Sequence, residues 1–347
     1  MKKFFTVAAS LILSAAMLTA CGSSAAPAAT TGAPETTAVT QAPAAETTEE
    51  TKSFHIAIVQ QLDHASLDEI RLAVEDELTK AAADKGFQVS YKEFNGQNDN
   101  TVLNQIGAQV VSDKYDAIIP IASLAAQCMV TAADGTNTPI IYAAVSDPAT
   151  AGLTDIPNVT GTSEALNTAF ILDMMLAAQP DVKTVGLLYS NSEANSQTPI
   201  AQAKEYLEQK GIAYIEKTGN STDEILTAAS SLVGRVEAVF TPTDNVVMAC
   251  EGAVAEILNQ AGIAHYTGAD SFVAAGAFTT SGVNYTELGT YTADMAVDIL
   301  LGGAVPDYHV MDGGIITVNT DTAEALGIDY SVFTTMANTV TEVTTVE

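Results

Sequence analysis

Residues 54–94 read FHIAIVQQLDHASLDEIRLAVEDELTKAAADKGFQVSYKEF, and this stretch decides the fold. Its apolar run at 54–60 predicts a buried strand. Leu67–Lys85 repeats apolar residues at helical spacing until Gly86 stops the helix, and residues 87–94 predict a second strand. Because a strand–helix–strand unit with short connections places its strands parallel, the stretch predicts a parallel sheet covered by helices on both faces.

The same alternation continues along the chain. Strand candidates begin at residues 54, 87, 116 and 139, and a second series begins at residues 183, 212, 237 and 263. Segments with helical periodicity lie between them, for example at 101–112, 196–210, 223–233 and 246–260. Two series of four strands with similar spacing favour two alike α/β lobes over one long sheet.

These patterns predict the domain organisation. Lobe 1 comprises residues 53–160 and is completed by about 281–305, and lobe 2 comprises residues 161–280 and is completed by about 306–330. Residues 331–347 are expected to form a fraying C-terminal tail. Segments that return to each lobe would cross between the lobes several times, and we expect these crossings to act as a hinge.

The N-terminus carries an export signal. Two lysines precede the apolar run Phe4–Leu18, and a small-residue stretch leads to Cys21. The pattern predicts a signal peptide over residues 1–20, too short for a standard membrane span. It resembles the lipobox of bacterial lipoproteins, which implies that a lipidated Cys21 anchors an extracytoplasmic protein to the membrane; the alternative is a plain signal peptide. Residues 21–52, built mainly from Ala, Thr, Pro, Ser and Glu, predict a flexible linker.

The composition indicates an acidic, folded protein. The chain has 42 Asp+Glu against 13 Lys+Arg, and removal of the predicted signal peptide with its two lysines gives a formal charge of −31. Such a surface repels nucleic acid and anionic lipid head groups, so neither is an expected partner. Apolar residues make up 47% of the chain, which favours a packed core.

The cysteines and histidines predict neither a disulfide nor a metal site. Cys128 and Cys250 lie in helix-like stretches in different halves of the chain, so we expect two small buried hydrophobes although a bridge is conceivable. None of the four histidines has a partner at zinc-ligand spacing.

Polar side chains follow the predicted strands at their carboxyl ends, where open α/β sheets bind ligands. Any one of these residues could simply cap the following helix. Six polar strand ends together nevertheless indicate a binding cleft. The candidates from these strand ends are Gln60, Ser123, Gln127, Asp147, Asn191, Asp244 and Asp270.

The charges near these ends indicate the class of ligand. The only arginines, Arg71 and Arg235, lie away from the strand ends, and no lysine lies there, which disfavours a phosphate or dicarboxylate. An α-carboxylate could instead rest on the backbone N–H groups of residues 123–126. A small zwitterion, or a neutral or cationic molecule, fits this set. Asp244, Asp270 and Asp147 offer anionic partners for an ammonium group, and Asp244 is the predicted one. Candidate apolar walls, or ordinary core aromatics, are Tyr142, Tyr189, Phe272 and Tyr285.

Catalytic signatures are missing from the sequence. It contains no G-x-S-x-G, G-x-x-x-x-G-K or H-E-x-x-H motif, and no G-x-G-x-x-G after a strand. His64 and Ser66 are local neighbours that mark a helix start. We therefore expect no enzyme activity and no cofactor.

Several segments of the chain form a recognisable set. They include Ile58-Val59-Gln60, Ala122-Ser123-Leu124-Ala125-Ala126-Gln127, Ala143-Ala144-Val145-Ser146-Asp147-Pro148, Ser192-Glu193-Ala194-Asn195-Ser196, Pro242-Thr243-Asp244-Asn245 and Asn284-Tyr285. Together, over about residues 54–328, they resemble the substrate-binding lipoproteins of ABC importers of the tryptophan/tyrosine-binding type. The resemblance departs at Leu124, where the family often has proline, and at Ala269, where an acidic residue is common.

The resemblance implies a type I periplasmic-binding-protein fold, with two Rossmann-like lobes joined by a three-stranded hinge and the ligand, commonly an aromatic amino acid, held between them. By position, the cleft residues would be Gln60, Ser123, Gln127, Asp147, Asn191, Asn195, Asp244 and Asp270.

The predicted function is capture of a small molecule, most simply an amino acid, and its delivery to an ABC permease by a lipid-anchored monomer. The alternatives are a surface receptor that feeds a sensor, a sugar- or nucleoside-binding importer component, and an extracytoplasmic enzyme.

Overall fold

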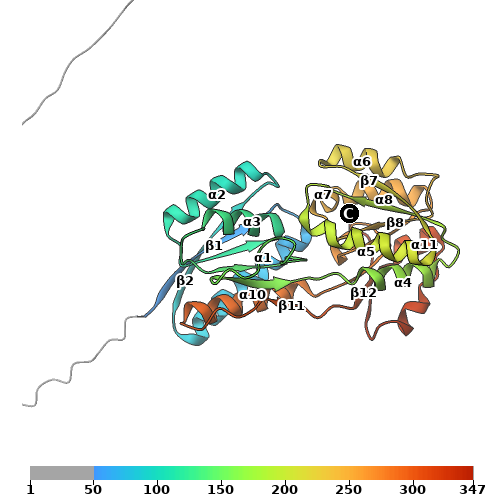
Figure 1. The fold of residues 1–347 in the computed structure, drawn as a ribbon. Coiled ribbons are helices and arrows are strands. Elements are labelled where there is room, and N and C mark those ends of the chain that lie inside the picture. The colour runs from blue at the N-terminus through green and yellow to red at the C-terminus, as the bar shows by residue number, and fades with distance from the viewer. Residues whose placement is uncertain (1–50, 347) are drawn as a thin grey trace, which may run out of the picture. The chain divides into compact units, whose positions relative to one another are not determined.

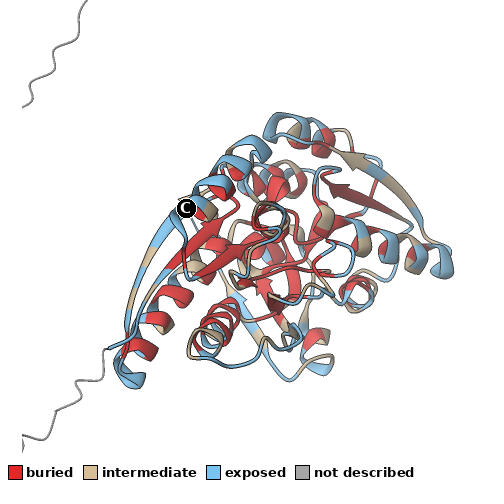
Figure 2. Cartoon of the chain, turned by 60° about the vertical axis from the view of Figure 1, so that its left-hand side comes forward, coloured by how far each residue is buried: buried red, intermediate tan, exposed pale blue. Residues whose placement is uncertain are grey.

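The computed structural model describes residues 51–346, which form two α/β lobes (Figure 1). The predicted signal peptide, the lipidation site Cys21 and the predicted linker up to residue 50 lie outside the described residues. Each lobe is built on one mainly parallel sheet, so the predicted fold class is confirmed. Figure 2 shows the strands largely buried and the outer faces of the helices exposed, as expected for sheets covered by helices.

The first lobe contains a six-stranded sheet in the order β11-β5-β4-β3-β1-β2, in which every neighbouring pair is parallel. Ile56 and Ile58 of β1 pack into one apolar cluster, and Ala57 and Val59 pack into another on the opposite face. This alternation explains why the strand is apolar throughout. The strands are β1 (Ser53–Gln60), β2 (Gln88–Asn95), β3 (Ala117–Ile121), β4 (Ile140–Tyr142), β5 (Val159–Ser163) and β11 (His309–Val310).

Four helices cover this sheet, α1 (Ala65–Lys85), α2 (Asn100–Asp113), α3 (Ser123–Ala132) and α10 (Tyr285–Leu300). Helix α1 ends at Gly86, which adopts the left-handed conformation with φ 74° and donates its N–H to the Ala82 carbonyl. Helix α10 packs so closely on α1 that a Cβ at Gly289 would lie 2.6 Å from the carbonyl oxygen of Ile70. This late helix therefore belongs to the first lobe.

The second lobe contains a seven-stranded sheet in the order β13-β12-β10-β9-β8-β6-β7, parallel except for the antiparallel pair β10–β12. Its strands are β6 (Thr184–Tyr189), β7 (Ala213–Thr218), β8 (Ala238–Thr241), β9 (Ala264–Thr267), β10 (Thr279–Gly282), β12 (Ile315–Asn319) and β13 (Val340–Val343). Its helices are α4 (Thr168–Ala178), α5 (Ala194–Lys210), α6 (Thr222–Ser230), α7 (Asn245–Met248), α8 (Glu251–Gln260), α9 (Asp270–Ala274), α11 (Thr320–Leu326) and the 3₁₀ helix η1 (Ser331–Thr335).

The chain crosses between the lobes three times. Residues 164–167 lead from β5 to α4, residues 283–284 lead from β10 to α10, and residues 311–314 lead from β11 to β12. These three short segments form the hinge (Figure 1).

Three local predictions are wrong, each for a physical reason. The boundary expected at residue 160 falls inside β5, a strand whose sequence VTGTS lacks the expected apolar run. The single helix expected at 246–260 is broken into α7 and α8, because Cys250 leaves the helical conformation at φ −132°. The tail expected to fray supplies β13, which pairs in parallel with β12 from Ile316↔Val340 to Asn319↔Val343.

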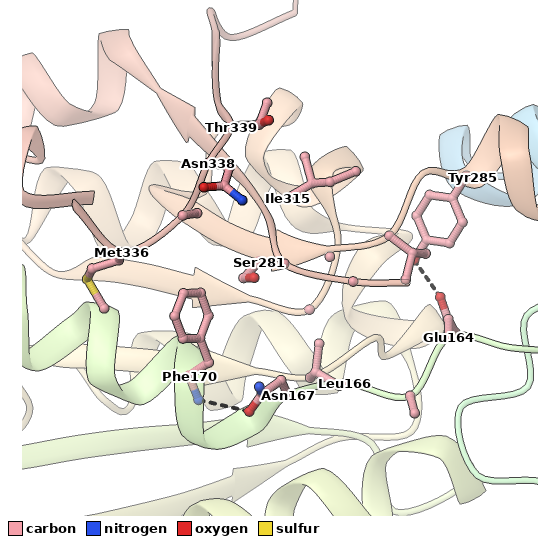
Figure 3. Close-up of a pocket in the computed structure, with 17 residues that line it drawn as sticks. Glu164, Leu166, Asn167, Phe170, Ser281, Tyr285, Ile315, Met336, Asn338 and Thr339 are labelled. Atoms are coloured by element: carbon pink, nitrogen blue, oxygen red, sulfur yellow. Dashed lines mark hydrogen bonds between the residues drawn. The ribbon is translucent and has the colours of Figure 1, made fainter. Parts of the chain in front are cut away.

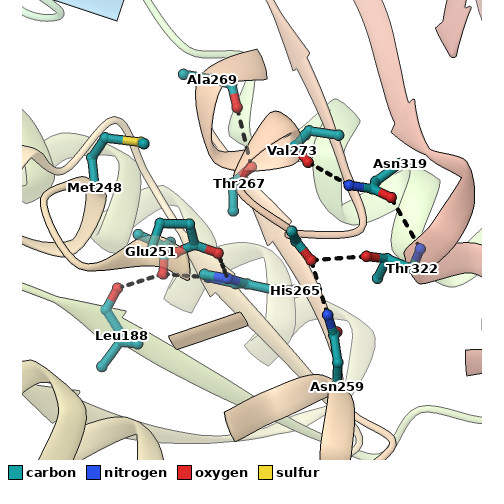
Figure 4. A network of polar contacts seen from close by, with 12 residues as sticks. Leu188, Met248, Glu251, Asn259, His265, Thr267, Ala269, Val273, Asn319 and Thr322 are labelled. Atoms are coloured by element: carbon teal, nitrogen blue, oxygen red, sulfur yellow. Dashed lines mark hydrogen bonds and ion pairs between the residues drawn. The ribbon is translucent and has the colours of Figure 1, made fainter. Parts of the chain in front are cut away.

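A buried polar network includes Glu251, the first residue of α8 (Figure 4). His265 Nδ1 lies 2.8 Å from Glu251 Oε1, and His265 Nε2 lies 2.8 Å from Thr241 Oγ1, which in turn donates to the Leu188 carbonyl. Burial raises the pKa of Glu251, and the neighbouring His265 opposes that shift. The network joins α8 to strands β9, β8 and β6 inside the second lobe.

Cys128 and Cys250 are both buried and unbridged, as the sequence predicts. Between residues 51 and 346 no helix has the length and apolar character that a membrane crossing requires.

Candidate functional site

The site lies where the two sheets present their carboxyl strand ends to each other. In the first sheet β1 lies between β2 and β3, and in the second sheet β6 lies between β7 and β8. These are the points at which successive connections depart to opposite sides, and ligands of open α/β sheets bind there.

A cleft between the lobes is lined by residues from both lobes and from the hinge. Its free volume is about 20 Å³, which holds about one water molecule. The lobes are therefore closed on each other, and a larger ligand enters only when they separate. The lining residues are His64, Ser66, Leu67, Ala122, Ser123, Ala144 and Tyr285 of lobe 1, Asn195, Thr243, Asp244, Asn245, Met248, Ala269 and Phe272 of lobe 2, and Glu164 at the hinge.

Direct hydrogen bonds hold the closed arrangement. They join side chains of opposite lobes and would break when the lobes open. The pairs are Gln61–Glu193 (2.9 Å), His64–Asn245 (3.0 Å), Ser66–Ser271 (2.5 Å), Ser146–Thr243 (3.1 Å) and Asp147–Thr198 (2.7 Å).

Glu164 is the carboxyl group at the junction of hinge and cleft. It accepts hydrogen bonds from Ser146 Oγ at 3.1 Å and from the Tyr285 hydroxyl at 2.6 Å. Burial raises its pKa to about 7, although hydrogen bonds from Tyr285 and Ser146 act in the opposite direction. The two hydroxyl bonds leave acceptor sites on both oxygens for a further donor.

A second buried carboxyl group, Glu193, lies on the lobe 2 side of the interface. Burial, followed by the nearby charge of Asp244, raises the pKa of Glu193 to about 7. Its oxygens accept from Gln61 Nε2 and from Asn245 Nδ2 at 2.6 Å. It therefore joins the lobes but does not line the cleft.

Helix α3 points its first turn at the cleft. Backbone N–H groups of a first helical turn lack partners within the helix, and they attract anions. The N–H of Leu124 donates to Gln61 Oε1 at 3.1 Å. Ser123, the first residue of α3, lines the cleft itself.

Two alanines in the cleft wall have left-handed backbone conformations. Ala122 has φ 76° and ψ 161°, and Ala144 has φ 55°. Both follow strands, β3 and β4, and both line the cleft. A non-glycine residue in such a conformation is strained by about 1–3 kcal/mol, and such strain concentrates at functional sites.

We expect Ala122→Gly to leave stability unchanged or to raise it by about 1 kcal/mol, because glycine relieves the strain and this gain exceeds its entropic cost. Ala83→Gly, on the exposed face of α1, is the control and should cost about 1 kcal/mol. Urea unfolding of both variants measures the difference. Equal destabilisation by the two substitutions would show that Ala122 is not strained.

The structure brings three of the predicted site residues into the cleft, Ser123, Asn195 and Asp244. Asn195 leaves its Oδ1 buried without a partner, so it can accept a hydrogen bond from a ligand. Asp147 bridges the lobes through Thr198 beside the cleft. Burial favours a higher pKa for Asp147, but hydrogen bonds from Thr150 and Thr198 outweigh it and lower the pKa.

The other four predicted residues do not line the cleft. Gln60 turns back to the Leu62 carbonyl and Asp68, and Gln127 holds the Ala151 carbonyl at 3.0 Å. Asn191 is exposed and bonds Thr218. Asp270 begins α9, and burial, with the charge of Glu69, raises its pKa.

The carboxylate of Asp244, the predicted ammonium partner, accepts four hydrogen bonds within lobe 2. Its Oδ1 accepts from the N–H groups of Val246 and Val247, and its Oδ2 accepts from the Ser190 N–H and the Ser196 hydroxyl. These four bonds occupy the acceptor sites of the carboxylate. The geometry makes Asp244 a buried cap that ties α7 to β6 and α5, and it leaves Glu164 as the cleft carboxyl with free acceptor sites.

Of the candidate aromatic walls, Phe272 and Tyr285 line the cleft, whereas Tyr142 and Tyr189 do not. Sequence reasoning missed Glu164, because β5 was not recognised and its carboxyl end was not considered. Its only local signal is the Thr-rich segment VTGTS that precedes it.

Residues 55–339 match the family described as "ABC transporter substrate binding protein". The chain belongs to this family. It is 32% identical over 290 residues to the tyrosine-binding protein of Clostridioides difficile (strain R20291), covering 80% of this chain and 82% of that protein.

Two solved structures are similar to this chain, one of them with a bound ligand and the other ligand-free and open. A domain from Streptococcus pneumoniae in complex with L-Trp is 28% identical, with a TM-score of 0.77 over 84% of this chain and 100% of its own. The ligand-free, open structure of a substrate binding protein with adhesive properties from Clostridium difficile is 32% identical, with the same coverage and a TM-score of 0.64. The better superposition on the less identical, liganded structure agrees with the closed arrangement of the lobes.

Proposed function

We propose that this protein is the solute-binding component of an ABC importer, and that it captures an aromatic amino acid between its lobes and delivers it to a membrane permease. The observation that carries the proposal is the cleft, which combines a helix N-terminus, a carboxyl group and apolar walls. Relatives that bind tyrosine and L-Trp support the same ligand class.

The cleft groups suit the three parts of such a ligand. The α-carboxylate would rest on the first turn of α3 at Ser123, and the ammonium group would bind Glu164. The aromatic ring would lie against Met248 and Phe272. Asn195 Oδ1 would accept a hydrogen bond from the ring hydroxyl of tyrosine or from the indole N–H of tryptophan.

The proposed function depends on closure of the two lobes around the ligand, and it involves no chemical reaction. The 20 Å³ of free space in the closed form excludes an amino acid, so binding needs an open form that closes with small side-chain shifts. A ligand that contacts both lobes favours the closed form over the open one, and a permease can recognise that difference. Ligand binding and delivery explain the residues that line the cleft, and we propose no catalytic role for them.

The export signal completes the proposal. A lipidated Cys21 would anchor the monomer outside the cytoplasmic membrane, and residues 22–52 would hold the lobes within reach of the permease. Tethering raises the effective concentration of the binding protein at its partner without any new contact.

Isothermal titration calorimetry tests the ligand class. We expect L-tyrosine or L-tryptophan to bind with micromolar affinity or better, and 3-(4-hydroxyphenyl)propionate, which lacks the ammonium group, to bind at least about 30-fold more weakly. Glucose and a nucleoside serve as controls for the sugar and nucleoside alternatives. Binding of either control in preference to every amino acid would contradict the proposal.

A further inference from the structure

A second cavity, of about 630 Å³, lies at the hinge, and we name it the hinge cavity (Figure 3). All three crossings contribute to its wall, together with the C-terminal segment 336–339. The volume is in the range of ordinary small-molecule sites. Because its wall contains every segment that joins the lobes, its shape depends on the angle between them.

The lining of the hinge cavity is amphipathic and carries no positive charge. Leu166, Phe170, Ile315 and Met336 supply apolar walls, and no Lys, Arg or His is among the lining residues. An anion would therefore find no counter-charge. The one carboxyl group in the lining, Glu164, lies where this cavity meets the cleft and accepts hydrogen bonds from Ser146 and Tyr285.

Ser281 provides an unused hydrogen-bonding group in this wall. The residue is 3% exposed, and its hydroxyl has no partner. Figure 3 shows it at the centre of the cavity, between Phe170 on one side and Asn338 and Ile315 on the other. A buried hydroxyl without a partner is unfavourable, and a ligand with one polar group would satisfy it.

Glu164 and Tyr285 line both the hinge cavity and the cleft. We propose that the hinge cavity binds a small, uncharged amphipathic molecule, such as an aromatic alcohol, and that its occupation stabilises the closed arrangement of the lobes. The coupling to the cleft rests on the proposed function, whereas binding in the hinge cavity does not. A ligand that fits the closed shape of the cavity shifts the population of lobes toward closure, and so tightens binding in the cleft.

Two methionines make the two sites separately observable. Met336 lines the hinge cavity and Met248 lines the cleft. With [¹³C-methyl]methionine-labelled protein, we expect benzyl alcohol to shift the Met336 resonance saturably while L-tryptophan is present to occupy the cleft. Benzoate, its anionic counterpart, should leave Met336 unmoved. Met336→Leu and Met248→Leu assign the two resonances.

Two variants test the site without disturbing the fold. Ser281→Ala removes a hydroxyl that has no partner, so it should preserve stability and weaken benzyl alcohol binding about fivefold. Ala165 is exposed and lines the cavity, so Ala165→Trp should block binding by filling space. Three results would each contradict the proposed binding site in the hinge cavity. They are a Met336 resonance that does not respond to benzyl alcohol, an equal response to benzoate, and unchanged binding of benzyl alcohol in Ala165→Trp.

Calorimetry with the amino acid tests the coupling. Saturating benzyl alcohol should lower the Kd of the cleft ligand about fivefold, and this gain should vanish in Ala165→Trp. An unchanged Kd alongside a saturable Met336 shift would overturn the coupling. If no amino acid binds at all, the proposed function fails, and the Met336 response in the absence of amino acid still decides the hinge site.

Discussion

Glu164→Gln is expected to weaken amino acid binding by about 100-fold and to leave the fold intact. The substitution removes the buried charge that we assign to the ligand ammonium group, and truncating such a pair costs about 2–5 kcal/mol. Glutamine keeps an oxygen that accepts from Ser146 or Tyr285, so the contacts that hold the hinge persist in part. Calorimetry gives the affinity, and urea unfolding gives the stability.

The pH dependence of binding separates this role from a structural one. Because burial raises the pKa of Glu164 to about 7, the free carboxyl group is mostly protonated at pH 6 and must lose its proton to bind an ammonium group. The wild-type Kd should therefore rise roughly tenfold for each pH unit below about 7 and stay level above it. Glu164→Gln should abolish this slope.

Asp270→Asn is the matched control for Glu164→Gln. It makes the same carboxyl-to-amide change in a residue whose pKa is also raised, first by burial, but which does not line the cleft. Its affinity should stay within about threefold of the wild type, with the pH slope retained. If Asp270→Asn lost affinity and Glu164→Gln did not, the ammonium partner would be Asp270, as the sequence alone allows.

The fold could be predicted from the sequence because its strands are short apolar runs separated by helices with clear periodicity. Strand β5 shows the limit of that signal. Its hydroxyl side chains are buried through tertiary bonds, such as Thr162 to Thr292 at 2.8 Å and Ser163 to the Ser146 carbonyl, and a threonine-rich segment does not reveal such partners. The same gap hid Glu164, which follows β5.

The site was harder to predict because a shift of one position along a strand end changes which side chain faces the other lobe. Gln60 and Gln61 are adjacent at the end of β1, and successive side chains of a strand face opposite sides. Gln60 turns back to its own lobe, and Gln61 bonds Glu193 across the interface. No composition or spacing rule distinguishes the two, since the choice depends on where the strand ends in three dimensions.

For Asp244, the sequence and the structure lead to opposite predictions about replacement by alanine. If Asp244 were the ammonium partner, the Asp244→Ala variant would bind the amino acid more weakly and keep the stability of the wild type. The structure predicts the reverse, because alanine would leave four donors without an acceptor inside lobe 2: the N–H groups of Ser190, Val246 and Val247 and the hydroxyl of Ser196.

We expect Asp244→Ala to lower the free energy of unfolding by about 3–5 kcal/mol, which is a large share of the stability of a protein of this kind. Burial of the carboxylate raises its pKa, and its removal recovers some of that unfavourable burial, but four lost bonds outweigh this gain. Urea unfolding followed by circular dichroism gives the value.

Asp99→Ala is the control for the capping contribution in Asp244→Ala. Asp99 accepts from the N–H groups of Thr101 and Val102 at the start of α2, as Asp244 does at the start of α7, but it is exposed. Water can replace its two bonds, so its loss should be much smaller than that of Asp244→Ala. Equal losses in the two variants would mean that capping alone explains Asp244. Normal stability of Asp244→Ala with lost amino acid binding would restore Asp244 as the ammonium partner and remove Glu164 from that role.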